Sequence, residues 1–142
     1  VKVDESCKHI VEHGNVLSVP SRLSVKYVQQ WLQYQAGLYL PDRLAFLAKT
    51  YGLTYTNCTI RRTTSRWGSC SSRKTISLNA ALMLLPSNQI DYVLLHELCH
   101  TVHMNHSDRF WQLMQQVCPD YKSLRKSVKG FAMPVWWSAK AR

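Results

Sequence analysis

The run HELCH places His96 and His100 four residues apart and puts Glu97 directly after the first of them. On a helix, residues at this spacing lie one turn apart on the same face, so both imidazoles can reach a single metal ion. Catalytic zinc typically has three protein ligands and keeps a fourth position for water, whose pKa the ion lowers to about 7. A carboxylate beside that water can accept its proton. The run therefore predicts a zinc-dependent hydrolase with Glu97 as the base.

The flanking residues predict the helix that this motif needs. Pro86, Ser87 and Asn88 offer the chemistry of a helix start, and Asp91 suits a first helical turn. Four apolar residues fall on the side of the helix opposite the histidines: Leu94, Leu95, Leu98 and Val102. This apolar side would hold the helix on a core while the histidines face a cleft.

A third ligand is expected downstream of the motif. It is not a glutamate, because Glu97 is the last one in the chain. His103 lies seven residues after His96, which is about 10 Å along a straight helix and too far for one ion. His106 avoids this limit if the helix unwinds near Met104 and Asn105, where asparagine tolerates a left-handed conformation. His106 is therefore preferred, with His103 and Asp108 kept as alternatives.

A second helix is expected to begin directly after His106. Ser107 can cap it, and its apolar residues recur at helical spacing: Phe110, Trp111, Met114 and Val117. Such a helix would fix His106 on a rigid element opposite the first two histidines.

Further motifs extend the pattern on both sides of HELCH. They are RWGSC from Arg66, TISLN from Thr75, IDYV from Ile90, NHS from Asn105, FW from Phe110 and PDYK from Pro119. With these motifs, residues 20–130 resemble the YgjP-like predicted metal-dependent hydrolases, which are related to SprT-like and other zincin metallopeptidases. The resemblance implies a zincin-like fold, metal ligands at His96, His100 and His106, and Glu97 as the catalytic acid/base. The family usually has proline where this chain has Met104.

Length and composition favour one domain spanning residues 1–142. The chain has 142 residues, 46% of them hydrophobic, which is enough for one core and too short to favour two. No apolar run approaches the ~20 residues that a bilayer-spanning helix needs, and the first residues show no signal-peptide pattern. The five cysteines form neither an even framework nor a CxxC pair, which favours free thiols in a reducing cytoplasm.

The chain carries a net charge of +10 that is unevenly distributed. No acidic residue lies between Asp42 and Asp91, whereas seven basic residues do: Arg43, Lys49, Arg61, Arg62, Arg66, Arg73 and Lys74. A positive field beside the catalytic helix would attract anionic partners such as nucleic acid, nucleotides or acidic peptides.

The patterns along the chain predict an α+β fold. The expected elements are a hairpin within residues 1–19, helical runs at 24–38 and 41–52, strands at 55–62 and 75–79, and the helices described above. The hairpin turns around Gly14, and Pro41 separates the two helical runs. The strands are expected to form a small antiparallel sheet packed against the HExxH helix. Three tryptophans would help to close the core: Trp111, Trp136 and Trp137.

The most plausible reaction from these residues is peptide hydrolysis. Zinc would polarise the scissile carbonyl, Glu97 would deprotonate the water, and a further donor would hold the oxyanion. Arg66, His103 and Tyr121 are unranked candidates for that donor and for substrate binding. A peptide could add as an extended strand along the sheet, beside residues 75–79.

Two other functions remain open. A metal-dependent nucleotide pyrophosphohydrolase would use the basic interval to hold phosphates, but such chemistry usually recruits Mg²⁺ through carboxylates, which are few near the motif. A basic nucleic-acid-associated module with structural zinc is the other; structural sites, however, normally have four ligands and are rich in cysteine. Nitrogen ligands also accept first-row metals other than zinc.

Overall fold

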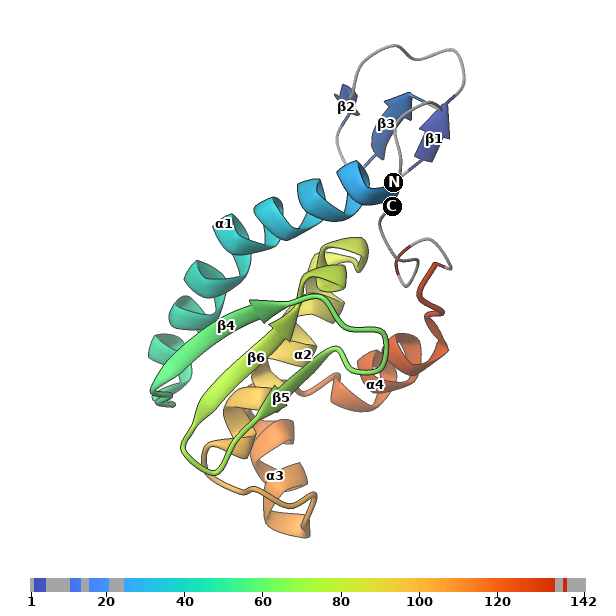
Figure 1. Cartoon of the computed structure of the whole chain (residues 1–142). Helices are drawn as coiled ribbons and strands as arrows, with labels where there is room; N and C mark the ends of the chain where they lie inside the picture. The colour runs from blue at the N-terminus through green and yellow to red at the C-terminus, as the bar shows by residue number, and fades with distance from the viewer. Residues whose placement is uncertain (1, 5–10, 14–15, 21–24, 135–136, 138–142) are drawn as a thin grey trace.

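The computed structural model describes residues 2–4, 11–13, 16–20, 25–134 and 137 (Figure 1). Three short strands come first: β1 (Lys2–Asp4), β2 (Val11–His13) and β3 (Val16–Pro20). In their sheet, the central β3 pairs in parallel with β1 and antiparallel with β2. The β2–β3 pair confirms the predicted hairpin, whose tip at Gly14 and Asn15 lies outside the described residues.

A single long helix, α1 (Val25–Tyr51), follows the first sheet. The prediction of two helical runs is wrong, because Pro41 lies inside this helix. An internal proline costs about 3 kcal/mol. Buried leucines continue on both sides of it, at Leu32, Leu40, Leu44 and Leu47. Each contributes about 1.5–3 kcal/mol when buried, so packing outweighs the local penalty. The helix stops before Gly52, as predicted, and this glycine has the left-handed φ of +67° typical of a helix end.

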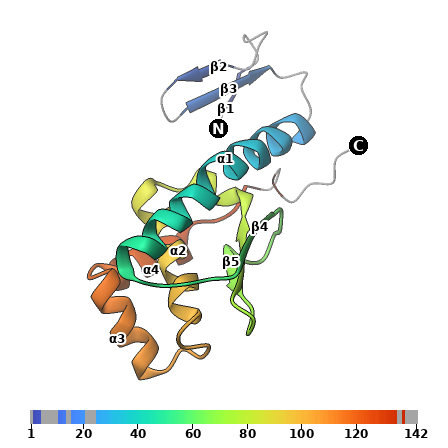
Figure 2. The same cartoon turned by 90° about the vertical axis from the view of Figure 1, so that its left-hand side faces the viewer.

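The second sheet is mixed, not antiparallel as predicted. Its strands are β4 (Asn57–Arg61), β5 (Gly68–Cys70) and β6 (Thr75–Asn79), in the order β4-β6-β5. β6 pairs in parallel with β4 and antiparallel with β5. β4 and β6 are parallel because residues 62–67 lead from β4 at one edge of the sheet to β5 at the other edge. After a tight turn, the chain returns as β6 between the two. Helices α1 and α2 cover one face of this sheet (Figures 1 and 2).

The crossing segment 62–67 is tied to the end of β6 by Asn79, which is 2% exposed. The side-chain amide of Asn79 donates to the carbonyl oxygens of Thr63 (2.9 Å) and Arg66 (2.8 Å). Its carbonyl oxygen accepts from the backbone N–H of Ala81 (3.0 Å), at the start of the 3₁₀ helix η1 (Ala80–Leu84). One side chain thus satisfies backbone groups on both sides of the strand end.

We expect Asn79→Ala to lower the free energy of unfolding by about 2–4 kcal/mol, because three hydrogen bonds from one buried side chain to backbone groups are lost at once. Denaturant titration followed by circular dichroism measures this change. Asn88→Ala is the matched control, since Asn88 is exposed and should change stability by no more than about 0.5 kcal/mol. Equal midpoints for the two variants would contradict the assigned role of Asn79.

Three helices complete the fold: α2 (Ser87–His100), α3 (Asp108–Val117) and α4 (Tyr121–Gly130). α2 is central, because it contacts α1, α3, α4 and strands β5 and β6. Its apolar side is buried as predicted at Leu94, Leu95 and Leu98, but Val102 lies beyond the helix end and is 55% exposed. None of the described helices is both long enough and apolar enough to cross a bilayer.

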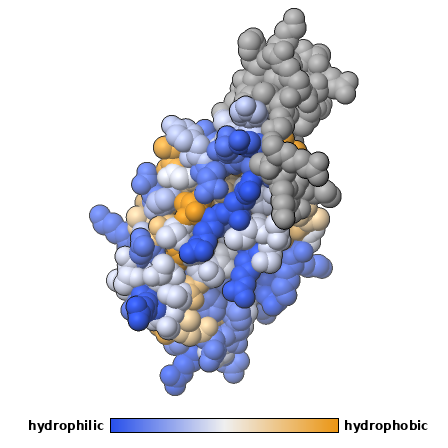
Figure 3. All heavy atoms as spheres, viewed as in Figure 1, coloured by the Kyte–Doolittle hydropathy of each residue, from blue (hydrophilic) through white to orange (hydrophobic). Residues whose placement is uncertain are grey.

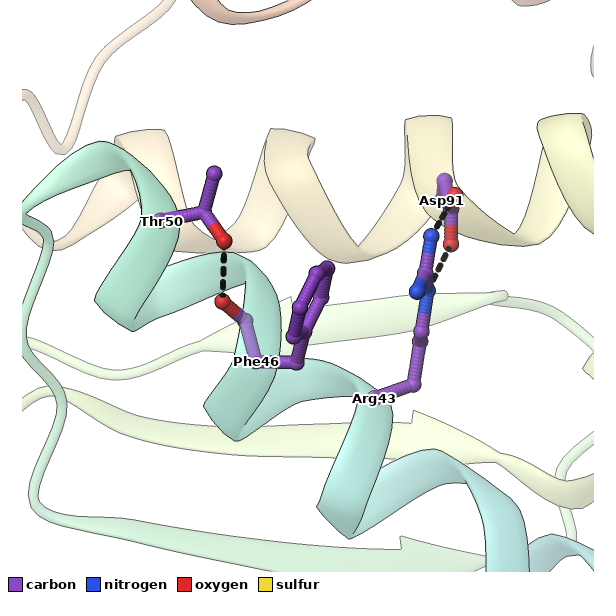
Figure 4. A network of polar contacts seen from close by, with 4 residues as sticks. All are labelled: Arg43, Phe46, Thr50 and Asp91. Atoms are coloured by element: carbon purple, nitrogen blue, oxygen red, sulfur yellow. Dashed lines mark hydrogen bonds and ion pairs between the residues drawn. The ribbon is translucent and has the colours of Figure 1, made fainter.

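The start of α2 also differs from the prediction. The helix is preceded by Pro86 without a side-chain cap, and Asp91 lies beyond the first turn. Asp91 instead accepts two hydrogen bonds from the guanidinium of Arg43 on α1, at 2.9 and 2.7 Å (Figure 4). The same guanidinium lies 4.9 Å from the ring centroid of Phe46. Such a part-exposed pair contributes at most about 1 kcal/mol, and its forked geometry links α1 to α2.

The core lies between the second sheet and the helices. Trp137 is 1% exposed and confirms one of the three predicted core tryptophans, Trp111 is partly buried, and Trp136 lies outside the described residues. The indole N–H of Trp137 donates to the carbonyl of Thr63 at 2.9 Å, so the end of the chain also holds segment 62–67. The face seen in Figure 1, which carries the second sheet, is mostly hydrophilic (Figure 3).

Candidate metal centre and cleft

Helix α2 ends at the second histidine of the motif. Thr101 is the C-cap, and its hydroxyl donates to the carbonyl of Leu98 at 2.6 Å. The backbone N–H of His103 bonds to the carbonyl of Cys99 at 3.0 Å. The expected unwinding at Met104 and Asn105 therefore occurs earlier. A left-handed asparagine is not used, since Lys74 is the only described non-glycine residue with positive φ.

The turn brings the ring of His106 against those of His96 and His100. Its Nε2 lies 3.1 Å from Nε2 of His96 and 3.1 Å from Nε2 of His100. Among the described residues, these three histidines form the only group of potential ligands whose donor atoms all lie within 4.8 Å. Neither His103 nor Asp108 belongs to this group, so the geometry favours His106 among the three alternatives.

The arrangement of the three nitrogens fits binding of one metal ion better than it fits hydrogen bonds among the rings. Nδ1 of His100 lies 3.0 Å from the carbonyl oxygen of His103, which can only accept. A neutral His100 ring therefore carries its proton on Nδ1 and presents a lone pair at Nε2. One proton on Nε2 of His106 would serve only one of its two neighbours. Zinc bonds of about 2.0–2.1 Å at tetrahedral angles separate ligand nitrogens by about 3.3 Å. This value is close to the 3.1 Å that separates Nε2 of His106 from Nε2 of each of the other two histidines.

Burial favours the neutral form of two of these rings, those of His96 and His106. The pKa of His96 is lowered to about 3, first by burial and then by the charges that His100, His106 and Arg125 would bear. The pKa of His106 is also lowered, mainly by burial. Nδ1 of His96 has no hydrogen-bond partner among the described residues, so this ring is oriented by packing. A neutral imidazole offers a metal the lone pair that an imidazolium lacks.

Helix α3 supplies that packing. Ser107 caps it as predicted, accepting from the backbone N–H of Phe110 at 3.4 Å. The Phe110 ring stacks on His100 with centroids 4.5 Å apart. Trp111 stacks on His106 with centroids 5.6 Å apart. The histidines are therefore held by an aromatic wall, which restricts their rotation and lowers the local polarity.

Glu97 lines the same cleft as His96 and His106 and is 6% exposed. Burial raises the pKa of its carboxyl to about 8, opposed by the positive charge of Arg66. The side chain faces Gly68 at the start of β5. A Cβ at Gly68 would lie 3.1 Å from Cγ of Glu97, 3.2 Å from its Oε2 and 3.3 Å from the carbonyl oxygen of Ser77. Gly68 thus leaves the room that the carboxylate occupies. The sequence motif RWGSC contained this glycine, but sequence reasoning gave it no role.

We expect Gly68→Ala to reduce kcat/KM by about tenfold, because the new methyl group would push Glu97 away by a few tenths of an ångström. A misplacement of about 1 Å can cost about 10²-fold. The metal content should not change. Gly37→Ala on α1 is the control, since no atom lies within 4 Å of a Cβ there. Steady-state kinetics that do not separate the two variants would argue against a positional role for Gly68.

A cleft of about 400 Å³ opens beside His96, Glu97 and His106. Of the three residues considered for substrate binding, Arg66 lines this cleft. Tyr121 lies behind Trp111, on which it stacks at 5.4 Å between centroids, and lines a neighbouring hollow. His103 is not among the residues that line the cleft and contributes its backbone carbonyl to His100. The cleft is also lined by two apolar residues, Trp67 and Val128, which were not predicted from the sequence.

The strand expected to receive a peptide is not available for pairing. β6 is central and is paired on both sides, by β4 and by β5. β5 is the edge strand nearest the cleft, because it contacts α2 and its Gly68 faces Glu97. An added strand in the second sheet would therefore lie beside β5.

This architecture, a small sheet over an HExxH helix with a third histidine beyond it, is the zincin-like metallopeptidase fold. A crystal structure of the metallopeptidase zymogen abylysin from Pyrococcus abyssi is similar, with 26% identity, a TM-score of 0.56, and 62% of this chain and 90% of that chain covered. The metallopeptidase zymogen jannalysin from Methanocaldococcus jannaschii shares the fold, with 19% identity, a TM-score of 0.55, and coverage of 63% and 92%.

The chain belongs to the YgjP-like family, since the model of the YgjP-like metallopeptidase domain matches residues 7–131. No curated protein matches the sequence. At the level of the family, the chain is a metal-dependent peptidase, and the group of His96, His100 and His106 is the candidate site of the metal ion.

Proposed function

We propose that this protein is a zinc-dependent peptidase in which His96, His100 and His106 hold the ion and Glu97 is the catalytic acid/base. The observation that carries the proposal is the convergence of three imidazoles in an open cleft that the buried carboxyl group of Glu97 also lines. Zinc at such a site supplies a Lewis acid that makes water more acidic and polarises a carbonyl group. Imidazole nitrogens also bind other first-row metals, so zinc is the first of several ions to be tested.

The protein's own groups would carry the proton transfers and orient the substrate. Glu97 accepts a proton from the attacking water and delivers it to the leaving amine. Arg66 is our choice for the oxyanion donor, because it lines the cleft and acts electrostatically on Glu97. Tyr121 and His103 are weaker choices, since each is separated from the cleft as described above.

An extended peptide would bind along the open edge of β5. The opposite edge of β5 pairs with β6 through Gly68, Ser69 and Cys70. Backbone pairing on the open edge would hold peptides of many sequences in the same register. It would also bring a peptide bond past Glu97, which faces Gly68.

Nucleotide pyrophosphohydrolysis is the second candidate function, because cations line the cleft at Arg66, Arg125 and Lys129. Mg²⁺-dependent phosphoryl chemistry usually needs several carboxylates. Glu97 is the only carboxylate among the lining residues, which makes this function the weaker choice. A structural zinc site in a nucleic-acid-associated module has still less support, because such sites usually have four ligands and the histidine group has three.

The deciding experiment compares two substrates on one zinc-loaded preparation. We expect cleavage of a denatured protein, loss of cleavage after chelation, and recovery on adding zinc. A panel of nucleoside triphosphates is assayed in parallel for pyrophosphate release. Pyrophosphate release without protein cleavage would overturn the peptidase proposal.

The proposed location is a reducing cytoplasm, because the four cysteines that the structure describes are free thiols. They are Cys58, Cys70, Cys99 and Cys118.

A further inference from the structure

The cleft beside the histidines has a positively charged rim. Arg66 precedes β5 on one side, and Arg125 and Lys129 lie on α4 on the other. Arg125 and Lys129 are four residues apart, so they share one face of their helix. Glu97 is the only acidic residue that lines the cleft. The rim therefore has a surplus of positive charge where a substrate would bind.

Arg125 is held in place by aromatic rings. Its guanidinium carbon lies 5.2 Å from the ring centroid of Trp111, a distance typical of a cation–π contact. Trp111 in turn is stacked between Tyr121 and His106, at 5.4 and 5.6 Å between centroids. The cation is thus part of the wall that adjoins the candidate metal site.

None of the three rim cations forms an ion pair within the described part of the chain, where Arg43 and Asp91 form the only one. Like charges around one cleft repel each other, and an anion between them would relieve that repulsion. The lining of the cleft also contains apolar residues, which include Trp67, Val93 and Val128. A ligand that fits both features has an aliphatic stem and a terminal negative charge.

Building on the peptidase function proposed above, we infer that this cleft selects peptides with an acidic residue next to the cleaved bond. Glutamate matches best, because its methylene groups can pack on the apolar lining residues while its carboxylate reaches Arg125 or Lys129. Basic residues at the same position would be rejected by the rim. Arg66 would add to the field but lies close to Glu97, so the α4 pair is the better place to test selectivity.

The test maps cleavage sites in a mixed peptide library by mass spectrometry. For the zinc-loaded wild type, we expect aspartate and glutamate to be enriched about tenfold over lysine and arginine next to the cleaved bond. In the double variant Arg125→Glu/Lys129→Glu, this enrichment should disappear or reverse. Lys126→Glu is the matched control, because Lys126 lies on the same helix but does not line the cleft. Circular dichroism and metal content establish that each variant is folded and loaded.

The outcomes separate this inference from the proposed function. Cleavage by the wild type without acidic enrichment would overturn the inference and leave the peptidase proposal standing. Enrichment that persists in the loaded double variant would also overturn it, as would an equal loss in Lys126→Glu. Hydrolysis of nucleoside triphosphates without cleavage of any peptide would contradict both.

Discussion

Replacement of Glu97 by glutamine should abolish peptide cleavage while leaving the bound metal in place. Glutamine has nearly the same shape, so it fits the space beside Gly68, but it cannot accept a proton from water. General-base catalysis contributes about 10²–10⁴-fold to the rate, so we expect kcat to decrease by at least about 10²-fold. The KM should change little, because the amide keeps the dimensions of the cleft.

The measurement pairs single-turnover peptide cleavage with metal analysis of the same sample. Glu97 is buried and has no role as a ligand in the proposed mechanism, so wild type and variant should contain equal metal. Activity close to that of wild type would remove Glu97 from the mechanism. Inactivity with loss of metal would mean that the carboxylate supports the metal site and is not itself the base.

Replacement of His106 by alanine should weaken metal binding by at least about 100-fold, because the ion loses one of three protein ligands, a larger loss than the 10- to 100-fold typical of an outer-shell partner. The remaining pair, His96 and His100, would still converge from one helix. Purified wild type should contain about one ion per chain, as for a catalytic zinc site. The variant should contain almost none after dialysis. Zinc titration monitored by competition with a coloured chelator gives both affinities.

His103→Ala is the control for this experiment. The ring of His103 is outside the group of converging donors, and its contribution to His100 comes from the backbone carbonyl, which alanine retains. Its metal affinity should equal that of wild type. If His103→Ala loses metal and His106→Ala keeps it, the third ligand has been misassigned.

The convergence of the three histidines was predictable because its determinants are local. The spacing of His96 and His100 fixes one helical face, and Ser107 followed by Phe110 encodes the start of the next helix. The position of the turn was less predictable. Thr101 ends the helix through a bond of its hydroxyl to Leu98, which competes with the further helical turn expected before Asn105.

The sheet was predicted less well because its pairing is not local. The parallel pair of β4 and β6 is made across the whole of β5 and two turns, and strand patterns alone do not say which partner a strand chooses. The prediction of two helical runs at Pro41 was wrong for a related reason. Burial of side chains along α1 outweighs the local cost of an internal proline. The spatial role of Gly68 could not be inferred from sequence, because Glu97 is distant in sequence and meets it only in the folded chain.

The link between Trp137 and Thr63 has a consequence for how the cleft is maintained. Segment 62–67 places Arg66 and Trp67 in one wall of the cleft. Hydrogen bonds from Asn79 and from Trp137 to the carbonyl of Thr63 hold this segment in place. Shortening the protein to the part that supplies ligands and base would remove the hydrogen bond from Trp137. Such a shortened protein would keep the proposed metal ligands and base, but one wall of the cleft would be held less firmly.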